Sequence, residues 1–301
     1  MASKFQEIVN GRFGIAFALG LARTLPPVLG YRFAFFLANR IAGRRSLDMV
    51  QAVRANQWVV HGQEPSAAEL DEIVSAAFRH TARCLYDLYH NLHNLPKMQE
   101  LIDFGPRFEE LVEQINSRER GMVIVGPHLS GFDFVGQASA MKGMKAIVIT
   151  FARPSEGYKW QNDIRQYAGL EIAPASMGVM KEAVKRLKGG ETVLTGVDRP
   201  VPDPRYRPNF FGLPSSLPVH HIMLALRAKV PVLVAAVVMR PDHIYEIVVS
   251  DFIEMEQYGD RDKDILCNAE RVLEVTADMI RGVPEQWTMT YPVWPEITPP
   301  S

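Results

Sequence analysis

His128 and Asp133 are the two side chains whose types and spacing best fit a chemical role. His128 directly follows the apolar run at residues 121–126, and Asp133 lies five residues later. A neutral imidazole removes a proton from a hydroxyl group near pH 7, and a carboxylate on its other ring nitrogen fixes the tautomer. The pair therefore suits activation of an alcohol. The alternative is that Asp133 caps a helix and His128 is an ordinary loop residue.

Short apolar runs that are typical of buried parallel strands recur along the second half of the chain. They cover residues 121–126, 146–150, 192–195, 230–239 and 245–249. Helical stretches separate several of them, and the proline-rich residues 198–217 predict a long loop after a strand. Strands that alternate with helices predict an α/β fold with a largely parallel sheet flanked by helices. Ligands bind such sheets at the carboxyl ends of the strands, where His128 lies.

The first third of the chain reads as helical. Its two apolar runs, residues 13–22 and 31–42, are each shorter than the roughly 20 residues that a spanning helix needs, and Pro26-Pro27 separates them. We expect residues 1–45 to form a membrane-associated helical hairpin, followed by an α/β domain over residues 46–301. A signal peptide is the alternative, but no small-residue cleavage site precedes Arg23.

Charge is unevenly distributed along the chain. Residues 1–60 hold eight basic and two acidic side chains, whereas the whole chain carries a net charge of −1. A basic, apolar N-terminus favours contact with an anionic membrane surface, although a solvated basic helix face has the same composition. The overall balance argues against a nucleic-acid partner. Two cysteines are too few for a disulfide framework.

Residues 126–133, with the sequence Gly-Pro-His-Leu-Ser-Gly-Phe-Asp, resemble the His-x4-Asp motif of glycerolipid acyltransferases. They are most similar to the bacterial branch that contains lipid A lauroyl/myristoyl acyltransferases and phosphatidylinositol mannoside acyltransferases. The later elements that resemble this branch are Asp198-Arg199 with Phe210-Phe211-Gly212, Ala225-Leu226-Arg227 with Val230-Pro231-Val232, and residues 280–287 with Trp294. The resemblance covers roughly residues 100–295.

The resemblance implies transfer of a fatty-acyl group from a thioester to a hydroxyl of a lipid or glycolipid, with His128 as the general base. Acyl-CoA or acyl-carrier protein would be the donor, and neither a cofactor nor a metal would be needed. It also implies peripheral or monotopic attachment to the cytoplasmic face of the bacterial inner membrane.

Roles for further residues follow from the same resemblance. Asp133, Asp198 or both together would orient His128, and Arg165 or Arg199 would stabilise the oxyanion together with backbone amides. The residues expected to bind substrate are Ser130, Arg153, Arg165, Arg199, Phe211 and Gly212. The chain departs from the family pattern at Asp198, which is often Glu, and at residues 218–221, where small residues are usual.

Two other functions stay open from the sequence. The side chains that a metal-dependent hydrolase would use are His128, Asp133, Asp198 and either His220 or His221. A non-catalytic lipid-binding protein would keep the fold and the membrane contact without chemistry. A second group with metal-ligand chemistry shares one helical face but has no evident fourth ligand: His80, Cys84 and Asp87.

Overall fold

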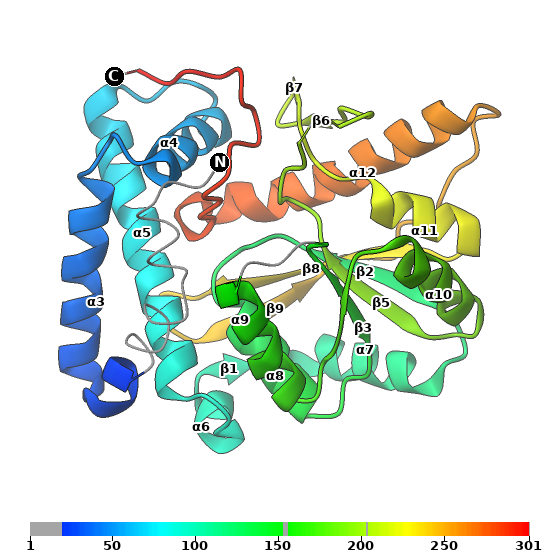
Figure 1. Ribbon diagram of the computed structural model, residues 1–301, viewed down its shortest axis with the longest axis horizontal. Helices are drawn as coiled ribbons and strands as arrows, with labels where there is room; N and C mark the ends of the chain where they lie inside the picture. Colours follow the sequence, from blue (N-terminus) through cyan, green and yellow to red (C-terminus); the bar gives the residue numbers. More distant parts are fainter. Residues whose placement is uncertain (1–19, 153–155, 203, 301) are drawn as a thin grey trace.

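A seven-stranded sheet with the order β1-β9-β8-β2-β5-β3-β4 forms the centre of the molecule in the computed structural model, which describes residues 20–152, 156–202 and 204–300 (Figure 1). The strands are β1 (Ile102–Asp103), β2 (Met122–Gly126), β3 (Ile147–Thr150), β4 (Glu171–Pro174), β5 (Thr192–Gly196), β8 (Val232–Met239) and β9 (Tyr245–Val249). β8, β2, β5, β3 and β4 run parallel, whereas β9 pairs antiparallel with β8. The predicted α/β fold with a largely parallel sheet is confirmed.

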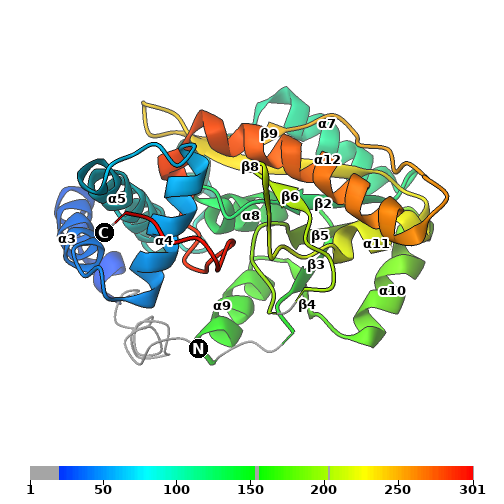
Figure 2. The same ribbon diagram turned by 90° about the horizontal axis from the view of Figure 1, so that it is seen from above.

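Helices cover both faces of this sheet, as the view from above shows (Figure 2). One face carries α10 (Met177–Lys188), α11 (His220–Ala228) and α12 (Arg261–Gly282), and the other carries α7 (Gly105–Ser117) and α8 (Phe132–Met141). Successive side chains of a strand point to opposite faces. Val123 and Val125 therefore join the core under α11 and α12, while Ile124 joins the core under α7 and α8. Two further helices, α6 (Leu95–Glu100) and α9 (Glu156–Tyr167), contact the edge strands β1 and β4 respectively.

A separate group of helices precedes the sheet: α3 (Pro27–Ala42), α4 (Asp48–Val60) and α5 (Ala67–His90). Ser66 and Glu69 form a capping box at the start of α5. α5 lies between α3 and the sheet (Figure 1). A Cβ at Gly30 would lie 2.0 Å from the ring of Tyr86, so α3 approaches α5 closely because Gly30 has no side chain. The described part of residues 1–45 thus packs on the rest of the molecule.

The outer face of α3 is apolar and accessible. Its exposed apolar side chains are Val28, Leu29, Phe33, Phe36 and Leu37, with Arg32 and Arg40 exposed beside them. No helix among the described residues is both long and apolar enough to cross a membrane. The first predicted apolar run, residues 13–22, lies almost entirely outside the described residues.

The segment after α12 returns to the helices at the beginning of the chain. The side-chain amide of Asn56 donates to the carbonyl oxygens of Met289 and Tyr291, and that of Gln57 donates to Trp287 O at 2.7 Å. Trp287 is completely buried as a result. These bonds from α4 fix the C-terminal segment against the carboxyl ends of the strands.

The region between β5 and α11 is mostly irregular, as its prolines predict, but it also contains a small hairpin. Its strands are β6 (Asn209–Phe210) and β7 (Leu213–Pro214). Phe211 and Gly212 form the turn, both with positive φ. The sequence analysis missed this hairpin and the edge strands β1 and β4, because these short segments, unlike β3, do not form a continuous apolar run.

Candidate active site

The carboxylate of Asp198 holds both the ring and the backbone of His128. Oδ1 accepts a hydrogen bond from Nδ1 of His128 at 2.6 Å, and Oδ2 accepts one from its backbone N–H at 2.8 Å. The indole N–H of Trp287 donates a further bond to Oδ2 at 2.7 Å. Burial opposes ionisation of Asp198, but the His128 ring and these donors outweigh it and lower the pKa of this carboxyl. An ionised Asp198 keeps the proton on Nδ1, so Nε2 of His128 carries the free lone pair.

The pairing of β2 with β5 explains why these two residues meet. Gly126 is paired with Gly196 at the carboxyl ends of the two parallel strands. His128 and Asp198 each follow two residues later, so they leave the sheet side by side. A Cβ at Gly196 would lie 3.2 Å from Cε1 of His128, so any side chain there would require the imidazole to shift.

The loop from β2 to α8 is fixed on the other side of His128. Leu129 forms an isolated bridge with Trp287, and the backbone N–H of Ser130 donates to Gln286 O at 2.9 Å. Ser130 has φ +47, a left-handed conformation that non-glycine residues seldom adopt. The ring of Phe132 then packs edge-on against the imidazole, with 4.8 Å between the ring centroids. His128 retains 27% of its side-chain accessibility.

Asp133 makes a different interaction from the one considered in the sequence analysis. It accepts two hydrogen bonds from Arg165 of α9, from Nε at 2.8 Å and from Nη2 at 3.0 Å. Nη1 of the same guanidinium donates to Asn162 Oδ1 at 2.9 Å. Burial acts against the charge of Arg165, but Asp133 outweighs it and raises the pKa of the guanidinium. Of the two carboxylates left open by the sequence, Asp198 is therefore the one that bonds the imidazole.

Arg199 lies between three aromatic rings. Its guanidinium carbon is 4.6 Å from the ring centroid of Tyr291, 4.7 Å from that of Phe151 and 5.5 Å from that of Tyr158. Nη2 donates to the hydroxyl of Tyr291 at 3.1 Å. No carboxylate among the described residues pairs with it, in contrast to Arg165. Stacking leaves the positive charge available to an anion or a developing oxyanion.

A cavity of about 380 Å³ lies beside Arg199 and is lined by residues from both faces of the sheet. His128, Asp133, Arg165 and Arg199 border it. The part under α7 and α8 is lined almost entirely by apolar side chains, among them Phe108, Leu111, Ile124, Val135, Met144, Leu194 and Val237. The part toward α11 is lined by residues that include Ile149, Thr195, Val201, Pro218 and His220.

A second cavity, of about 220 Å³, also borders His128, Asp133, Arg165 and Arg199. Its wall toward α5 includes Cys84 and Ser130, and the C-terminal segment contributes Thr288, Thr290 and Tyr291. The Ser130 hydroxyl is 3.0 Å from Nε2 of His80, a ring whose pKa burial lowers to about 4. The two cavities therefore meet at His128, and the second is the more polar in its side chains.

Two of the residues predicted to bind substrate lie outside both cavities. Phe211 and Gly212 do not border either cavity, and Phe211 instead packs against Trp294 and under the guanidinium of Arg281. A role of this turn in substrate binding therefore stays a prediction that the two cavities do not support. Ser130, Arg165 and Arg199 do border the second cavity. Arg153 lies outside the described residues.

The groups considered as metal ligands are distributed among other contacts. Asp87 accepts hydrogen bonds from the hydroxyls of Tyr31 and Tyr245, and His80 bonds Ser130. His220 bonds Thr195, whereas both ring nitrogens of His221 are buried without a partner among the described residues. Within the described part of the chain, no three His, Cys, Asp or Glu side chains are gathered as a metal site would require.

The sequence analysis missed Trp287, Tyr291 and His80 as parts of the site. They come from the C-terminal segment and from α5, far in sequence from His128. The one available signal for Trp287 was its place in the C-terminal element that resembles the acyltransferase branch.

Comparison with known proteins gives one family. The sequence model of the bacterial lipid A biosynthesis acyltransferases matches residues 6–295 of the chain. A search of curated proteins found no match. The family match spans the sheet, the His128 loop and the C-terminal segment that carries Trp287.

Proposed function

Because the chain belongs to the bacterial lipid A biosynthesis acyltransferase family, we propose that it transfers a fatty-acyl group from an acyl thioester to a hydroxyl of a lipid A-like acceptor, with His128 as the general base. The observation that carries the proposal is the bond between Asp198 and Nδ1 of His128, because it leaves Nε2 free to accept a proton.

The reaction needs one base and no covalent enzyme intermediate. Nε2 of His128 takes the proton of the acceptor hydroxyl as its oxygen attacks the thioester carbonyl carbon. A tetrahedral oxyanion forms, the carbon–sulfur bond breaks, and the departing thiolate takes the proton back from His128. The products are the acylated lipid and the free thiol, and the imidazole is again neutral. Asp198 stabilises the imidazolium during the transfer because it remains ionised beside Nδ1.

Arg199 is the best candidate among the described residues for stabilising the oxyanion. The donors of Arg165 are directed to Asp133 and Asn162, whereas the Tyr291 hydroxyl is the polar partner of Arg199 among the described residues. Negative charge that develops in the transition state is stabilised more by a cation without a carboxylate partner than by a cation that a carboxylate already neutralises. Arg165 and Asp133 would instead fix the wall that the two cavities share.

The apolar half of the first cavity fits the acyl chain. It lies between the sheet and the helices α7 and α8, and it begins at His128. The cavity volume of about 380 Å³ is within the range of about 300–1,000 Å³ that small-molecule sites occupy. Burial of methylene groups there would stabilise the bound donor by about 0.8 kcal/mol per group.

The second cavity suits the acceptor. Its hydroxyl-bearing side chains, such as Ser130 and Thr290, provide hydrogen bonds for a polar headgroup next to His128. The lipid tails would stay in the membrane, with the exposed apolar face of α3 in the acyl region and Arg32 and Arg40 near the phosphates. Acyl-CoA and acyl-carrier protein are both cytoplasmic donors, so we assign the protein to the cytoplasmic face of the inner membrane.

The test is reconstitution with purified full-length protein. Acyl-CoA and acyl-carrier protein are supplied in separate reactions with a lipid A precursor, and the lipid product is identified by mass spectrometry. A mass increase of one acyl group, dependent on His128, supports the proposal. Binding of the lipid without any product from either donor would reject it in favour of a lipid-binding protein.

A further inference from the structure

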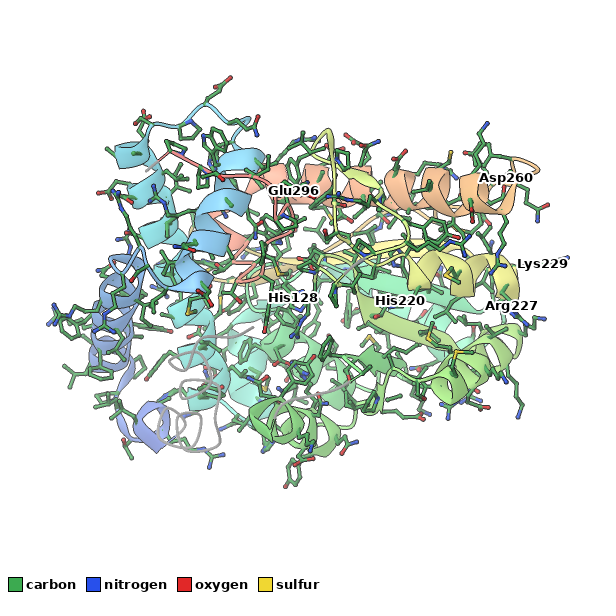
Figure 3. All side chains as sticks on the ribbon, turned by 45° about the horizontal axis from the view of Figure 1, so that its top comes forward. His128, His220, Arg227, Lys229, Asp260 and Glu296 are labelled. Carbon is green, nitrogen blue, oxygen red and sulfur yellow. The ribbon has the colours of Figure 1, made fainter. Side chains whose placement is uncertain are left out.

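His220 lies at the first position of α11, on the same end of the sheet as His128. Figure 3 shows both labelled histidines near the middle of the molecule, whereas Arg227 and Lys229, at the other end of α11, lie at its edge. The two histidines border the same cavity. The link between them is β5, because the Thr195 hydroxyl bonds His220 and the next residue, Gly196, lies beside the His128 ring, where an added Cβ would be 3.2 Å from Cε1.

The hydrogen bonds of Thr195 determine the tautomer of His220. The Thr195 hydroxyl lies 3.1 Å from Ile149 O and 3.1 Å from Nε2 of His220. A carbonyl oxygen only accepts, so the single hydroxyl proton goes to Ile149 and Nε2 of His220 must donate to Thr195. Burial lowers the pKa of His220 to about 4, so the ring is neutral at pH 7. Nδ1 therefore carries a lone pair.

This lone pair has no hydrogen-bond donor among the described residues. The His220 ring is deep in the protein but keeps some accessible surface, which faces the cavity that it borders. The apolar side chains that line this part of the cavity, including Ile149, Ala175 and Pro218, offer no polar hydrogen, and the Thr150 hydroxyl, which also lines the cavity, makes no hydrogen bond to the ring. An isolated acceptor in such surroundings is unfavourable unless a bound molecule satisfies it.

We infer that Nδ1 of His220 accepts a hydrogen bond from the first amide N–H of the pantetheine arm of the acyl thioester. The inference rests on the proposed function. With the thioester carbonyl at His128 and the acyl chain under α7 and α8, the thiol side of the donor is directed toward α11. The first N–H on that side follows two methylenes after the sulfur, and it is present in both acyl-CoA and acyl-carrier protein. His220 is thus a specificity residue for the donor thiol.

Two donors that differ only in this amide test the inference. One is a short acyl N-acetylcysteamine thioester, and the other is the S-pentyl thioester of the same acid, in which methylenes replace the amide. The enzyme is compared with His220→Phe, which removes the acceptor, and His220→Asn, whose side-chain oxygen can occupy the position of Nδ1. Wild-type kcat/KM should favour the amide donor. His220→Phe should lower that preference by about threefold to tenfold, as expected for loss of one hydrogen bond, and His220→Asn should retain most of it.

His221→Leu is the matched control, because His221 is adjacent but borders neither cavity. It should leave the donor preference unchanged. Melting temperatures identify any variant that does not fold, and His220→Leu replaces His220→Phe in that case. An equal loss with both donors in His220→Phe would overturn the inference, as would a preference that His220 variants leave intact.

The hydroxyl of a β-hydroxyacyl chain is the other group that could donate to Nδ1 of His220. A β-hydroxyacyl thioester tests this alternative. If His220→Phe lowers only the preference for the β-hydroxyacyl over the plain acyl thioester, the hydroxyl is the partner and the assignment to the amide is wrong. If wild type transfers from no donor, or transfers without His128, the proposed function itself fails. Transfer that requires His128 but not His220 would reject this inference alone.

Discussion

Asp198 bonds His128 at two points, with Oδ1 on the ring nitrogen Nδ1 and Oδ2 on the backbone N–H. The bond to the ring sets its tautomer, and the bond to the backbone sets the position of the loop from which the ring projects. The indole N–H of Trp287 donates a third hydrogen bond to the carboxylate, to the same Oδ2. The orientation of the proposed base therefore depends on a residue 70 positions away and on the C-terminal segment.

Asp198→Asn should lower kcat by about 10²–10⁴-fold, the usual contribution of general base catalysis. The amide keeps the shape of the carboxylate but loses the charge that stabilises the imidazolium and fixes the tautomer. The measurement is single-turnover acyl transfer at saturating donor, with circular dichroism to verify folding. Unchanged turnover in a folded Asp198→Asn protein would show that the dyad does not take part in the reaction.

Asp133→Asn is the control for charge at the site. It should lower the free energy of unfolding, because it leaves the buried Arg165 without its ion-pair partner. It should change the pH dependence of kcat little. Breaking a buried pair in this way costs about 3–5 kcal/mol, which urea unfolding would detect. A larger loss of kcat in Asp133→Asn than in Asp198→Asn would reverse the roles assigned to the two carboxylates.

Protein stability should fall as the pH drops below about 6.5. Burial lowers the pKa of His80 and of His220 to about 4, and it also lowers the pKa of His221 well below its usual value. Between the unfolded value of about 6.5 and about 4, the unfolded chain binds protons that the folded chain does not, so the free energy of unfolding decreases. Urea unfolding at about pH 7, 6 and 5 measures the slope. His221→Leu should reduce it, and a stability independent of pH over this range would contradict the prediction.

The preference of the enzyme for acyl chains of a given length should depend on Gly136 of α8. This residue borders the cavity, and an added Cβ there would meet no atom within 4 Å. Gly136→Leu should fold and fill part of the acyl space, so kcat/KM for long donors falls relative to short ones. Gly136→Ala, with far less added volume, is the matched control. Equal activity of Gly136→Leu across a series of chain lengths would show that the acyl group binds elsewhere.

Membrane attachment through α3 is testable without deleting the helix, whose packing on α5 includes the hydrogen bond from Tyr31 to Asp87. Phe36→Glu with Leu37→Glu places charge on the exposed face and should weaken flotation with anionic liposomes. Met177→Glu changes an exposed apolar side chain on α10 and serves as the control. High salt should weaken binding of the wild type further. If the α3 variant floats as well as wild type, the membrane contact lies elsewhere.

The sequence predicted the layers of the fold because strand and helix periodicities are local properties. The runs at residues 121–126 and 192–195 correspond to β2 and β5, which fixes the position of His128 at the carboxyl end of the sheet. The same reasoning could not choose between Asp133 and Asp198. That choice depends on β2 and β5 being neighbours in the sheet, and the order of strands is a long-range property that periodicity does not contain.

The contacts of other candidate residues could not be predicted from the sequence for the same reason. Asp133 is five positions away, but the first turn of α8 directs its carboxylate to Arg165 of α9. Phe211 and Gly212 belong to a motif that resembles the family, yet their turn lies outside both cavities. The sequence suggested His220 as a departure from the family pattern and as one of two alternative metal ligands, and its relation to Thr195 appears once α11 is packed on the sheet.

The most direct measurement of the central claim is acyl transfer by the His128→Ala protein. Purified wild type and variant are given the same acyl thioester and lipid acceptor, and the acylated lipid is quantified by mass spectrometry. We expect a fall in turnover of about 10²–10⁴-fold in a protein that still folds, as circular dichroism would verify. The melting temperature should fall, because the buried Asp198 loses the ring donor and keeps only the His128 backbone N–H and the Trp287 indole. Turnover close to that of wild type in the folded variant would contradict the central claim.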